Sequence, residues 1–222
     1  MTTVLIFDTE TTGHAEPVLI EAAGLFIQDV RTLSVLGNFE QRYNPGKPIE
    51  TGAMATHHIL DEDLVECPPA DTFRLPEGVD YLVGHKIDYD WEVIGKPGVK
   101  RICTLAMARK VWPDADSFSQ SALMYRLAKD RNRVRDALKE AHSALADVKF
   151  CRFILKKILD EKPMDSWDAL WTFSEACRIP DVMPFGKHKG VAIKELPRDY
   201  VGWALKNLTD MDPYLRKAME CA

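Results

Sequence analysis

The chain has 222 residues, 46% of them hydrophobic and 28% charged, which is enough for one sizeable core and a small appended module. Its formal net charge of −5 argues against a protein that coats nucleic acid through bulk electrostatics, although a local basic patch or bound metal ions can still hold phosphates. The five cysteines form no C-x-x-C pair, and no apolar run approaches the roughly 18 residues of a membrane span. We therefore expect a cytoplasmic protein with reduced thiols and no membrane partner.

The first expected element is a buried strand that ends in acids. Val4-Leu5-Ile6-Phe7 is apolar, and Asp8-Thr9-Glu10-Thr11-Thr12-Gly13 follows it directly. Because strand side chains alternate between faces, Asp8 and Glu10 should point to the same side, close enough to share a cation. The alternative is an ordinary strand end with solvated acids, but the flanking apolar and Thr-Thr-Gly segments make the pattern more specific.

Two further strands, over residues 18–28 and 33–43, should complete a set of three joined by short turns. Glu21 lies inside the second of them, and we expect an edge or outward-facing acid there. Residues 49–64 indicate a helical connection. A short buried strand over 79–83 comes next.

The segment Gly84-His85-Lys86-Ile87-Asp88-Tyr89-Asp90 follows that strand and places another acid, Asp90, behind an aromatic ring. Lys86 has two candidate partners, the carboxylate of Asp88 or a nucleic-acid phosphate.

Helices are then expected over 104–111, before Trp112-Pro113, and over 118–127. A basic run comes next, either a solvated helix end and loop or a phosphate-steering patch. It comprises Arg126, Lys129, Arg131, Arg133 and Arg135.

The last motif of this region is His142-Ser143-Ala144-Leu145-Ala146-Asp147. Five residues along a continuous helix would leave His142 and Asp147 about 140° apart, so one helix would not direct both at one site. We therefore expect His142 at or before a helix start, Ser143 near the cap and Asp147 inside the helix.

These motifs, in this order, resemble those of the DEDDh exonucleases of the ribonuclease H-like superfamily. The resemblance implies that Asp8, Glu10, Asp90 and Asp147 bind two Mg²⁺ or Mn²⁺ ions, and that His142 takes the proton from the attacking water. Oxygen ligands suit these hard ions, and no Cys/His cluster suggests zinc.

The resemblance also suggests substrate contacts. Ala53–Ile59 is similar to the A-x-x-x-H-x-I stretch that borders the pocket for the nucleic-acid 3′ end in this family, which makes His57 a candidate. Thr9 and Thr11, beside the acids, are further candidates. Lys86 is another, and it departs from the family pattern, which usually has Asn at this position.

The C-terminal region is predicted to form a separate module with helices at about 166–178, 198–208 and 213–221. Between the first two lies Gly186-Lys187-His188-Lys189-Gly190, which lacks the spacing of a phosphate-binding P-loop. It is either an ordinary basic hairpin or a turn that presents Lys187 and Lys189 to phosphates. The F-G-K-x-x-G segment and the helix with Trp203 resemble a C-terminal module of bacterial DEDDh exodeoxyribonucleases, which favours the second interpretation.

We thus expect an α/β protein with a ribonuclease H-like mixed five-stranded sheet, helices on both faces and a small helical or α+β module. The expected domains are a catalytic domain (1–162), a helical linker (163–182) and a C-terminal module (183–222). The family implies 3′→5′ hydrolysis of DNA to nucleoside 5′-monophosphates, with an exoribonuclease or a non-catalytic replication or repair subunit as alternatives. Its partner would be single-stranded DNA or DNA 3′ ends, while duplex DNA, RNA and a homodimer remain open.

Overall fold

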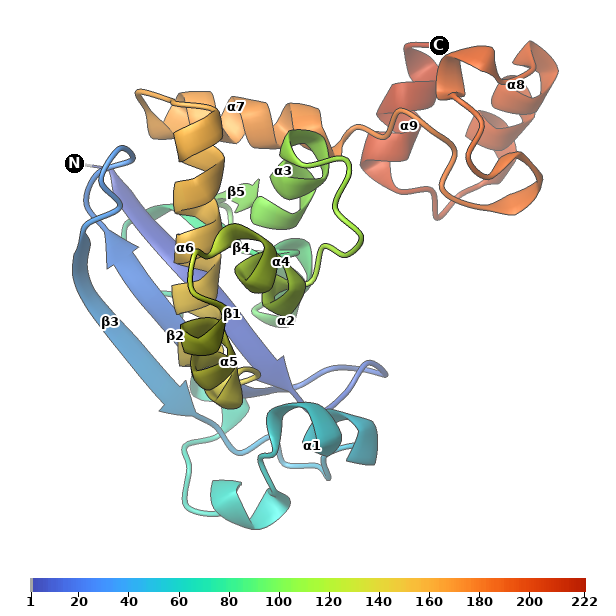
Figure 1. Ribbon diagram of the computed structural model, residues 1–222. Helices are drawn as coiled ribbons and strands as arrows, with labels where there is room; N and C mark the ends of the chain where they lie inside the picture. The colour runs from blue at the N-terminus through green and yellow to red at the C-terminus, as the bar shows by residue number, and fades with distance from the viewer. Residues whose placement is uncertain (1) are drawn as a thin grey trace. The chain divides into compact units, whose positions relative to one another are not determined.

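The computed structural model describes residues 2–222, which divide into two units (Figure 1). The first unit ends at Trp171 and the second is Thr172–Ala222. The division falls inside the segment predicted as a linker, and the predicted domain boundaries stay a prediction. Among the described residues, no helix has both the length and the apolar character needed to cross a membrane.

The first unit is built on a five-stranded sheet in the order β3-β2-β1-β4-β5 (Figure 1). Strand β1 pairs with β2 and β2 with β3 in antiparallel fashion, whereas β1–β4 and β4–β5 are parallel. This confirms the predicted mixed sheet. The strands are β1 (Thr3–Thr11), β2 (Leu19–Ile27), β3 (Val35–Arg42), β4 (Val79–Gly84) and β5 (Lys100–Cys103).

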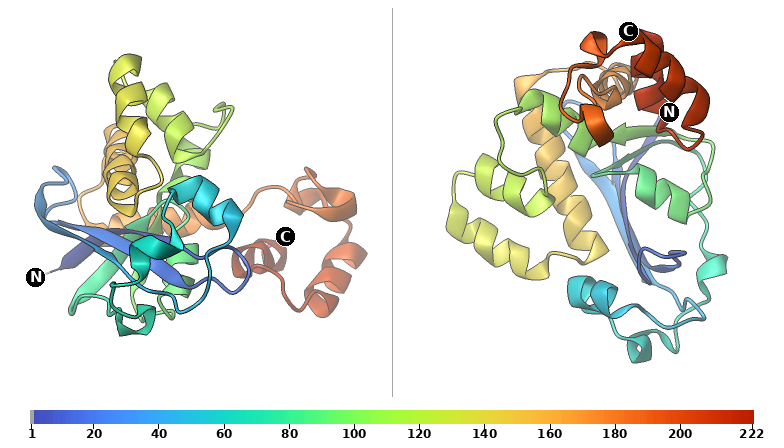
Figure 2. Two further views of the ribbon diagram at one scale, coloured as in Figure 1. Left: turned by 90° about the horizontal axis from the view of Figure 1, so that it is seen from below. Right: turned by 90° about the vertical axis from the view of Figure 1, so that its right-hand side faces the viewer.

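Both faces of the sheet are covered, which explains why the start of β1 is apolar without interruption. Leu5 and Phe7 belong to a cluster that includes Trp91 of helix α2 (Asp88–Val93), and the long helix α6 (Ala144–Glu161) packs on β1 and β2. Figure 2 shows these two helices on opposite sides of the strands. The predicted ribonuclease H-like layering, with helices on both faces, is confirmed.

The remaining helices of this unit largely follow the expected positions. They are α1 (Thr51–His57), α3 (Thr104–Val111), α4 (Gln120–Leu127) and α5 (Arg131–Ala137), with α7 (Trp167–Arg178) continuing past Trp171. Helix α5 was not expected, because its basic residues indicated a helix end and loop. It forms because the Asp130 side chain accepts hydrogen bonds from the N–H groups of Asn132 and Arg133, while Val134 is buried.

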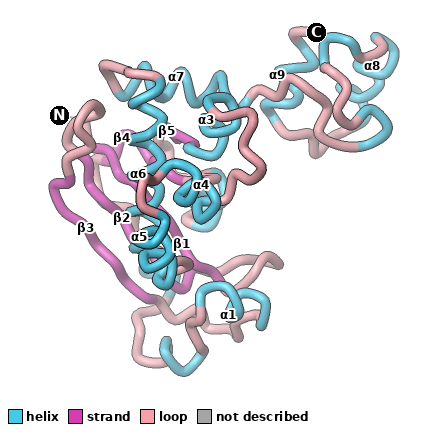
Figure 3. The backbone as a smooth tube through the Cα atoms, viewed as in Figure 1, coloured by secondary structure: helices cyan, strands magenta, loops and turns pink. Residues whose placement is uncertain are grey.

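The second unit contains α8 (Arg198–Asn207) and α9 (Pro213–Glu220), close to the predicted helices. Loops and short 3₁₀ turns connect α7 to α8 (Figure 3). A separate core of its own includes Met183, Ile193, Ala204 and Leu215. The unit therefore has a hydrophobic core of its own.

Candidate active site

Two carboxylates lie at the end of β1, on the face that α6 covers. Asp8 and Glu10 are two residues apart on the strand, so both side chains leave it on the same side, as the sequence predicted. Together with Asp147 of α6 they offer carboxylate oxygens that all lie within 4.8 Å of one another. Three carboxylates at that separation repel one another, and their oxygens could hold a metal ion.

The start of α6 brings the third acid to this group. The hydroxyl of Ser143 caps the helix by accepting a hydrogen bond from the Ala146 N–H, and Asp147 occupies the first turn. His142 lies just before the cap, is exposed, and has a left-handed backbone with φ of 66°. Its N–H makes a long 3.5 Å contact with Oδ1 of Asp147. This break in helical geometry places the two residues as the spacing predicted.

Asp90 sits beside the group, on α2, and is 4% exposed. Its Oδ1 accepts two hydrogen bonds from Thr9, one from the N–H at 2.9 Å and one from the hydroxyl at 2.6 Å. Asp90 is therefore fixed to the strand between Asp8 and Glu10. The Thr9 hydroxyl, a predicted substrate contact, is engaged with Asp90 in this structure.

The acids strongly perturb one another. Burial, followed by the charges of Asp90, Asp147 and Glu10, raises the pKa of Asp8 well above its ordinary value. Burial and then the charge of Asp147 raise the pKa of Glu10 to about 9. Such shifts indicate that Asp8 and Glu10 have no positively charged partner among the described residues. A bound divalent cation would supply that positive charge.

Asp90 and Asp147 are shifted in the same direction. Burial raises the pKa of Asp90 to about 7, against hydrogen bonds from Thr9 that lower it. Burial likewise raises the pKa of Asp147, with His142 opposing the change. All four predicted ligands are thus held in an environment that disfavours their ionisation.

Glu21 corrects a sequence-based expectation. We expected an outward-facing or edge acid, but Glu21 is 1% exposed and lies opposite Glu10 in the β1–β2 register. Its Oε1 accepts a hydrogen bond from Arg42 Nε, and its Oε2 accepts one from the N–H of Ala144, the first residue of α6, each at 2.9 Å. The apolar neighbours Ile20 and Ala22 were a signal for burial, because a charge within such a run needs partners.

A cavity of about 360 Å³ adjoins the acids through Glu10. Thr11, His57 and Tyr89 line it, and the Thr11 hydroxyl lies 2.7 Å from the Tyr89 hydroxyl. His57 is buried, its Nδ1 accepts the Ile59 N–H, and its Nε2 lacks a partner of normal hydrogen-bond geometry among the described residues. Burial lowers the pKa of His57, although the nearby Thr11 backbone opposes the shift. The lowered pKa favours the neutral imidazole.

The remaining predicted contacts are not among the residues that line this cavity. Lys86 has a left-handed backbone with φ of 75°, and its ammonium is 5.8 Å from the centroid of the Tyr89 ring. Its neighbour Asp88 forms an ion pair with Arg101. Lys187 and Lys189 belong to the second unit.

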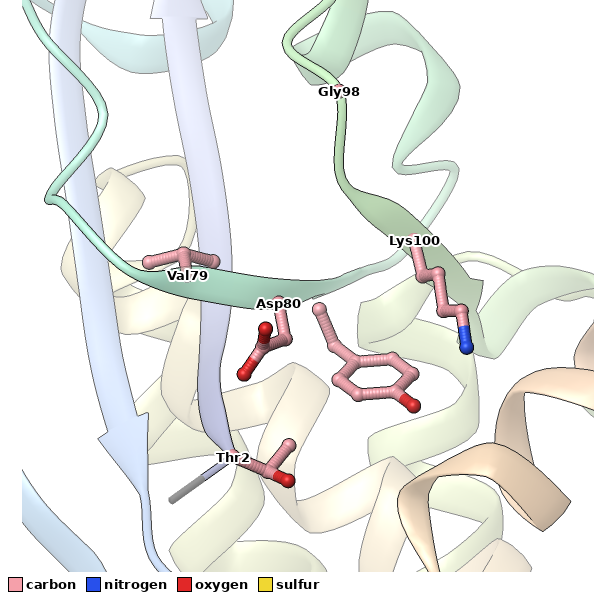
Figure 4. Close-up of a pocket in the computed structure, with 6 residues that line it drawn as sticks. Thr2, Val79, Asp80, Gly98 and Lys100 are labelled. Carbon is pink, nitrogen blue, oxygen red and sulfur yellow. The ribbon is translucent and has the colours of Figure 1, made fainter.

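Another cavity, of about 540 Å³, lies near the opposite end of β1 (Figure 4). Its lining includes Thr2, Asp80 and Lys100, and none of the four predicted ligands contributes to it. Asp80 accepts the Thr3 N–H, and Lys100 pairs with Asp168. These charges are partnered, unlike those at the end of β1.

Comparison with known proteins agrees with this geometry. Over 97% of its length the chain is 28% identical to exodeoxyribonuclease 10 of Escherichia coli K12, covering 96% of that protein. A structure of exonuclease X in complex with 5′-overhanging duplex DNA matches 77% of this chain and 99% of its own, at 23% identity and a TM-score of 0.62. The nuclease domain of 3′hExo, a DEDDh family member bound to rAMP, matches 72% of this chain and 92% of its own, at 12% identity and a TM-score of 0.54.

The chain has the fold of the DEDDh exonucleases. The predicted resemblance to that family, and to its bacterial exodeoxyribonucleases, is confirmed. A family model described as a putative quorum-sensing-regulated virulence factor matches residues 177–207, within the C-terminal part of the chain.

DEDDh exonucleases use divalent metal ions, and the acids of this chain fit that chemistry. The group of Asp8, Glu10 and Asp147 offers only oxygen ligands, as hard cations prefer. Raised pKa values are expected for carboxyls that bind a cation when no cation is bound, and these three carboxyls have them.

Proposed function

We propose that this protein is a metal-dependent 3′→5′ exonuclease that hydrolyses DNA from its 3′ end to nucleoside 5′-monophosphates. The observation that carries the proposal is the group of Asp8, Glu10 and Asp147 within 4.8 Å, with Asp90 fixed alongside and His142 at the start of the same helix as Asp147. Similarity to exodeoxyribonuclease 10 over nearly the whole chain supports DNA as the substrate.

Each residue has a distinct task in this proposal. Asp8, Glu10, Asp90 and Asp147 would hold two Mg²⁺ or Mn²⁺ ions, which supply Lewis-acid stabilisation of the phosphodiester being cleaved. The exposed imidazole of His142 accepts the proton of the attacking water as general base. Its place outside the helix leaves the ring free to approach solvent and substrate.

The cavity beside Glu10 is suited to the terminal nucleotide. Thr11 and Tyr89 offer hydroxyls, and the His57 side chain forms part of the lining, with its Nε2 buried. A 3′-terminal nucleoside has hydroxyl and base groups that such donors and acceptors recognise. Thr9 supports the site indirectly, through Asp90, and Lys86 remains a candidate for a phosphate contact.

An exoribonuclease is the second candidate, because the DEDDh domain of 3′hExo has a structure with rAMP. Sugar discrimination depends on contacts to the 2′-hydroxyl.

The test is digestion of 5′-labelled single-stranded DNA, duplex DNA and RNA of one sequence, in parallel, with Mg²⁺ and with EDTA. We expect a Mg²⁺-dependent ladder shortening from the 3′ end, fastest on DNA, and release of nucleoside 5′-monophosphates. Faster RNA digestion would replace DNA by RNA in the proposal. Absence of cleavage on all three substrates would overturn it and favour a non-catalytic binding subunit.

A further inference from the structure

The second unit exposes large aromatic side chains that its own core does not use. Trp203 on α8 is 52% exposed and Phe185 is 46% exposed, while the next residue along α8, Ala204, is fully buried in the core. An exposed tryptophan forfeits much of the stability that its burial would bring, so two exposed rings in a unit of this size favour a binding role.

The exposed tryptophan is part of a row of rings. Tyr200, one turn before Trp203 on α8, lies 6.0 Å from it between ring centroids, with an interplanar angle of 29°. The other side of the row is His188, whose ring centroid is 4.3 Å from that of Tyr200. Three rings from the helix and from the preceding loop therefore form one continuous aromatic surface.

The loop that carries His188 is held in shape by its backbone. The Met183 N–H donates to Val191 O and the Gly190 N–H donates to Met183 O, each at 2.8 Å, which closes the loop at its base. Gly186 and Gly190 take positive φ values of 71° and 82°, which glycine adopts without strain. The loop is thus a preorganised support rather than an adaptable tail.

Two cations flank the histidine on this loop. Lys187 and Lys189 are exposed, and neither forms an ion pair with any carboxylate in the described part of the chain. Residues 172–222 carry eight Lys and Arg against seven Asp and Glu, whereas the whole chain has a net charge of −5. Of the two units, the second therefore has the net charge that repels a polyanion less.

We propose that Lys187, His188, Lys189, Tyr200 and Trp203 form an aromatic–lysine surface that binds single-stranded DNA. Unpaired bases stack on the exposed ring of Trp203 in continuation of the row, and the lysines contact the adjacent phosphates. A duplex hides its base faces within its own stack, so this surface favours single strands. The choice of DNA rests on the proposed exonuclease function, whereas the preference for unpaired bases rests on the rings alone.

The first test measures binding of the full chain in EDTA, where cleavage is blocked, to fluorescein-labelled dT20 and to a blunt hairpin duplex. Trp203→Ala should weaken dT20 binding by about 5- to 150-fold, the effect of losing one base–aromatic stack, and change hairpin binding by less than about twofold. Trp203→Phe should retain most of the affinity. Val182→Ala, which trims another exposed apolar side chain of this unit, is the matched control.

The second test concerns the lysines. Replacing Lys187 and Lys189 together by Ala should lower the slope of log affinity against log salt by about 1.4 on single-stranded DNA, about 0.7 for each lost phosphate contact. The charge-matched control replaces Lys194 and Lys217, which line a separate cavity of the same unit. An equal effect in the control would reduce the lysine contacts to general electrostatics and overturn their part of the proposal.

A fluorescence measurement detects the stacking in the wild-type chain itself, so the test does not depend only on variants that could misfold. Stacking of thymine on an indole should quench tryptophan emission of the wild-type chain on dT20 addition, and Trp203→Phe should remove that quenching. Equal dT20 affinity in wild type and Trp203→Ala, or an equal loss on both substrates, would overturn the inference. Because binding is measured without metal, that result would leave Mg²⁺-dependent cleavage by the wild type untouched, and loss of cleavage would leave the stacking result untouched.

Discussion

Folded proteins usually expose charged side chains and bury large apolar ones. The acid group of the first unit departs from the first tendency, and the aromatic–lysine surface of the second unit departs from the second. The first buries like charges beside one another, which raises the pKa of Glu10 to about 9. The second leaves the large ring of Trp203 in solvent. Each arrangement costs free energy in the isolated chain, one through repulsion and desolvation, the other through apolar hydration. The kind of cost indicates the missing partner: cations for the acids, and stacked bases with their phosphates for the rings.

The largest expected effect comes from removing one of the repelling charges. Asp8→Asn should abolish Mg²⁺-dependent cleavage to background, because the group loses a ligand and a charge. The free energy of unfolding of the metal-free chain should stay level or increase, since the remaining acids repel less.

The matched control is Asp80→Asn, the same substitution in the cavity near the opposite end of β1. Cleavage should survive it. Wild-type rates in Asp8→Asn would end the assignment of this site.

The next largest effect is expected at His142. His142→Ala should slow the chemical step by about 10²- to 10⁴-fold, the usual contribution of a positioned base, while DNA binding in Ca²⁺ stays close to wild type. Single-turnover cleavage in Mg²⁺ and binding in Ca²⁺ separate the two effects.

His58→Ala is the matched control, because His58, like His142, is exposed and has a left-handed backbone, with φ of 58°. Any cost of placing Ala in that conformation is shared by both variants. His85 is a poor substitute base, since Thr104 and the Phe118 carbonyl engage its ring nitrogens and burial lowers its pKa to about 4. Cleavage at the wild-type rate in His142→Ala would show that the base lies elsewhere, with His57 the next candidate.

A smaller effect is expected from Glu21, which fastens the start of α6 to the sheet. Glu21→Ala leaves the Ala144 N–H without its acceptor, so the segment carrying His142 and Asp147 should loosen. We expect kcat to fall by about 10- to 100-fold, the scale on which misplacement of catalytic groups acts, with little change in KM.

Two variants distinguish positioning from plain stability. Glu21→Gln keeps an acceptor oxygen for Ala144 and should recover much of the rate. Arg42→Ala removes the ion pair but not the bond to Ala144, so it should lower stability, because the Glu21 carboxylate is buried, and leave kcat within about threefold. Equal rates in Glu21→Ala and Arg42→Ala would show that the bond to α6 does not matter for catalysis.

The acid pair and the helix start were predictable from sequence because local rules govern both. Alternation along a strand places Asp8 and Glu10 on one side, and a Ser143 cap fixes where α6 begins. Glu21 was not predictable in the same way, since its partner Ala144 is 123 residues away. Helix α5 was not predicted, although Asp130 is its N-cap, because a run of basic residues is also typical of a solvated helix end and loop.

The cavity beside Glu10 and the ring row of the second unit also depend on distant contacts. His57 was identified by its motif, but its burial and its unpartnered Nε2 depend on how α1 packs. Tyr200 and Trp203 lie one turn apart on a predicted helix, whereas the contact of His188 with Tyr200 needs the loop folded against α8. Sequence therefore supplied the chemical groups, and tertiary packing decided which of them face a ligand.

The smallest expected effect is a pH dependence of stability confined to the metal-free chain. The pKa of Glu10 is raised from 4.5 to about 9 and that of Asp90 from 3.8 to about 7, so the folded chain holds more protons than the unfolded chain between those values. This stabilisation is fully present below the unfolded pKa values and is lost as pH rises through about 7 and then about 9. In EDTA the unfolding midpoint should fall by a few degrees per pH unit between pH 6 and 9, since a difference of one bound proton changes the free energy of unfolding by about 1.4 kcal/mol per pH unit.

Saturating Mg²⁺ should flatten this dependence of the midpoint on pH, because bound cations keep the carboxylates ionised at every pH in this range. Asp8→Asn should make the curve less steep without metal, because it removes the titration of Asp8, whose own pKa burial and the neighbouring acids raise. A midpoint in EDTA that is constant from pH 6 to 9 would mean that the acids already have a cationic partner. The metal-free acid group would then not be destabilised by charge repulsion, and only the exposed rings of the second unit would indicate a missing ligand.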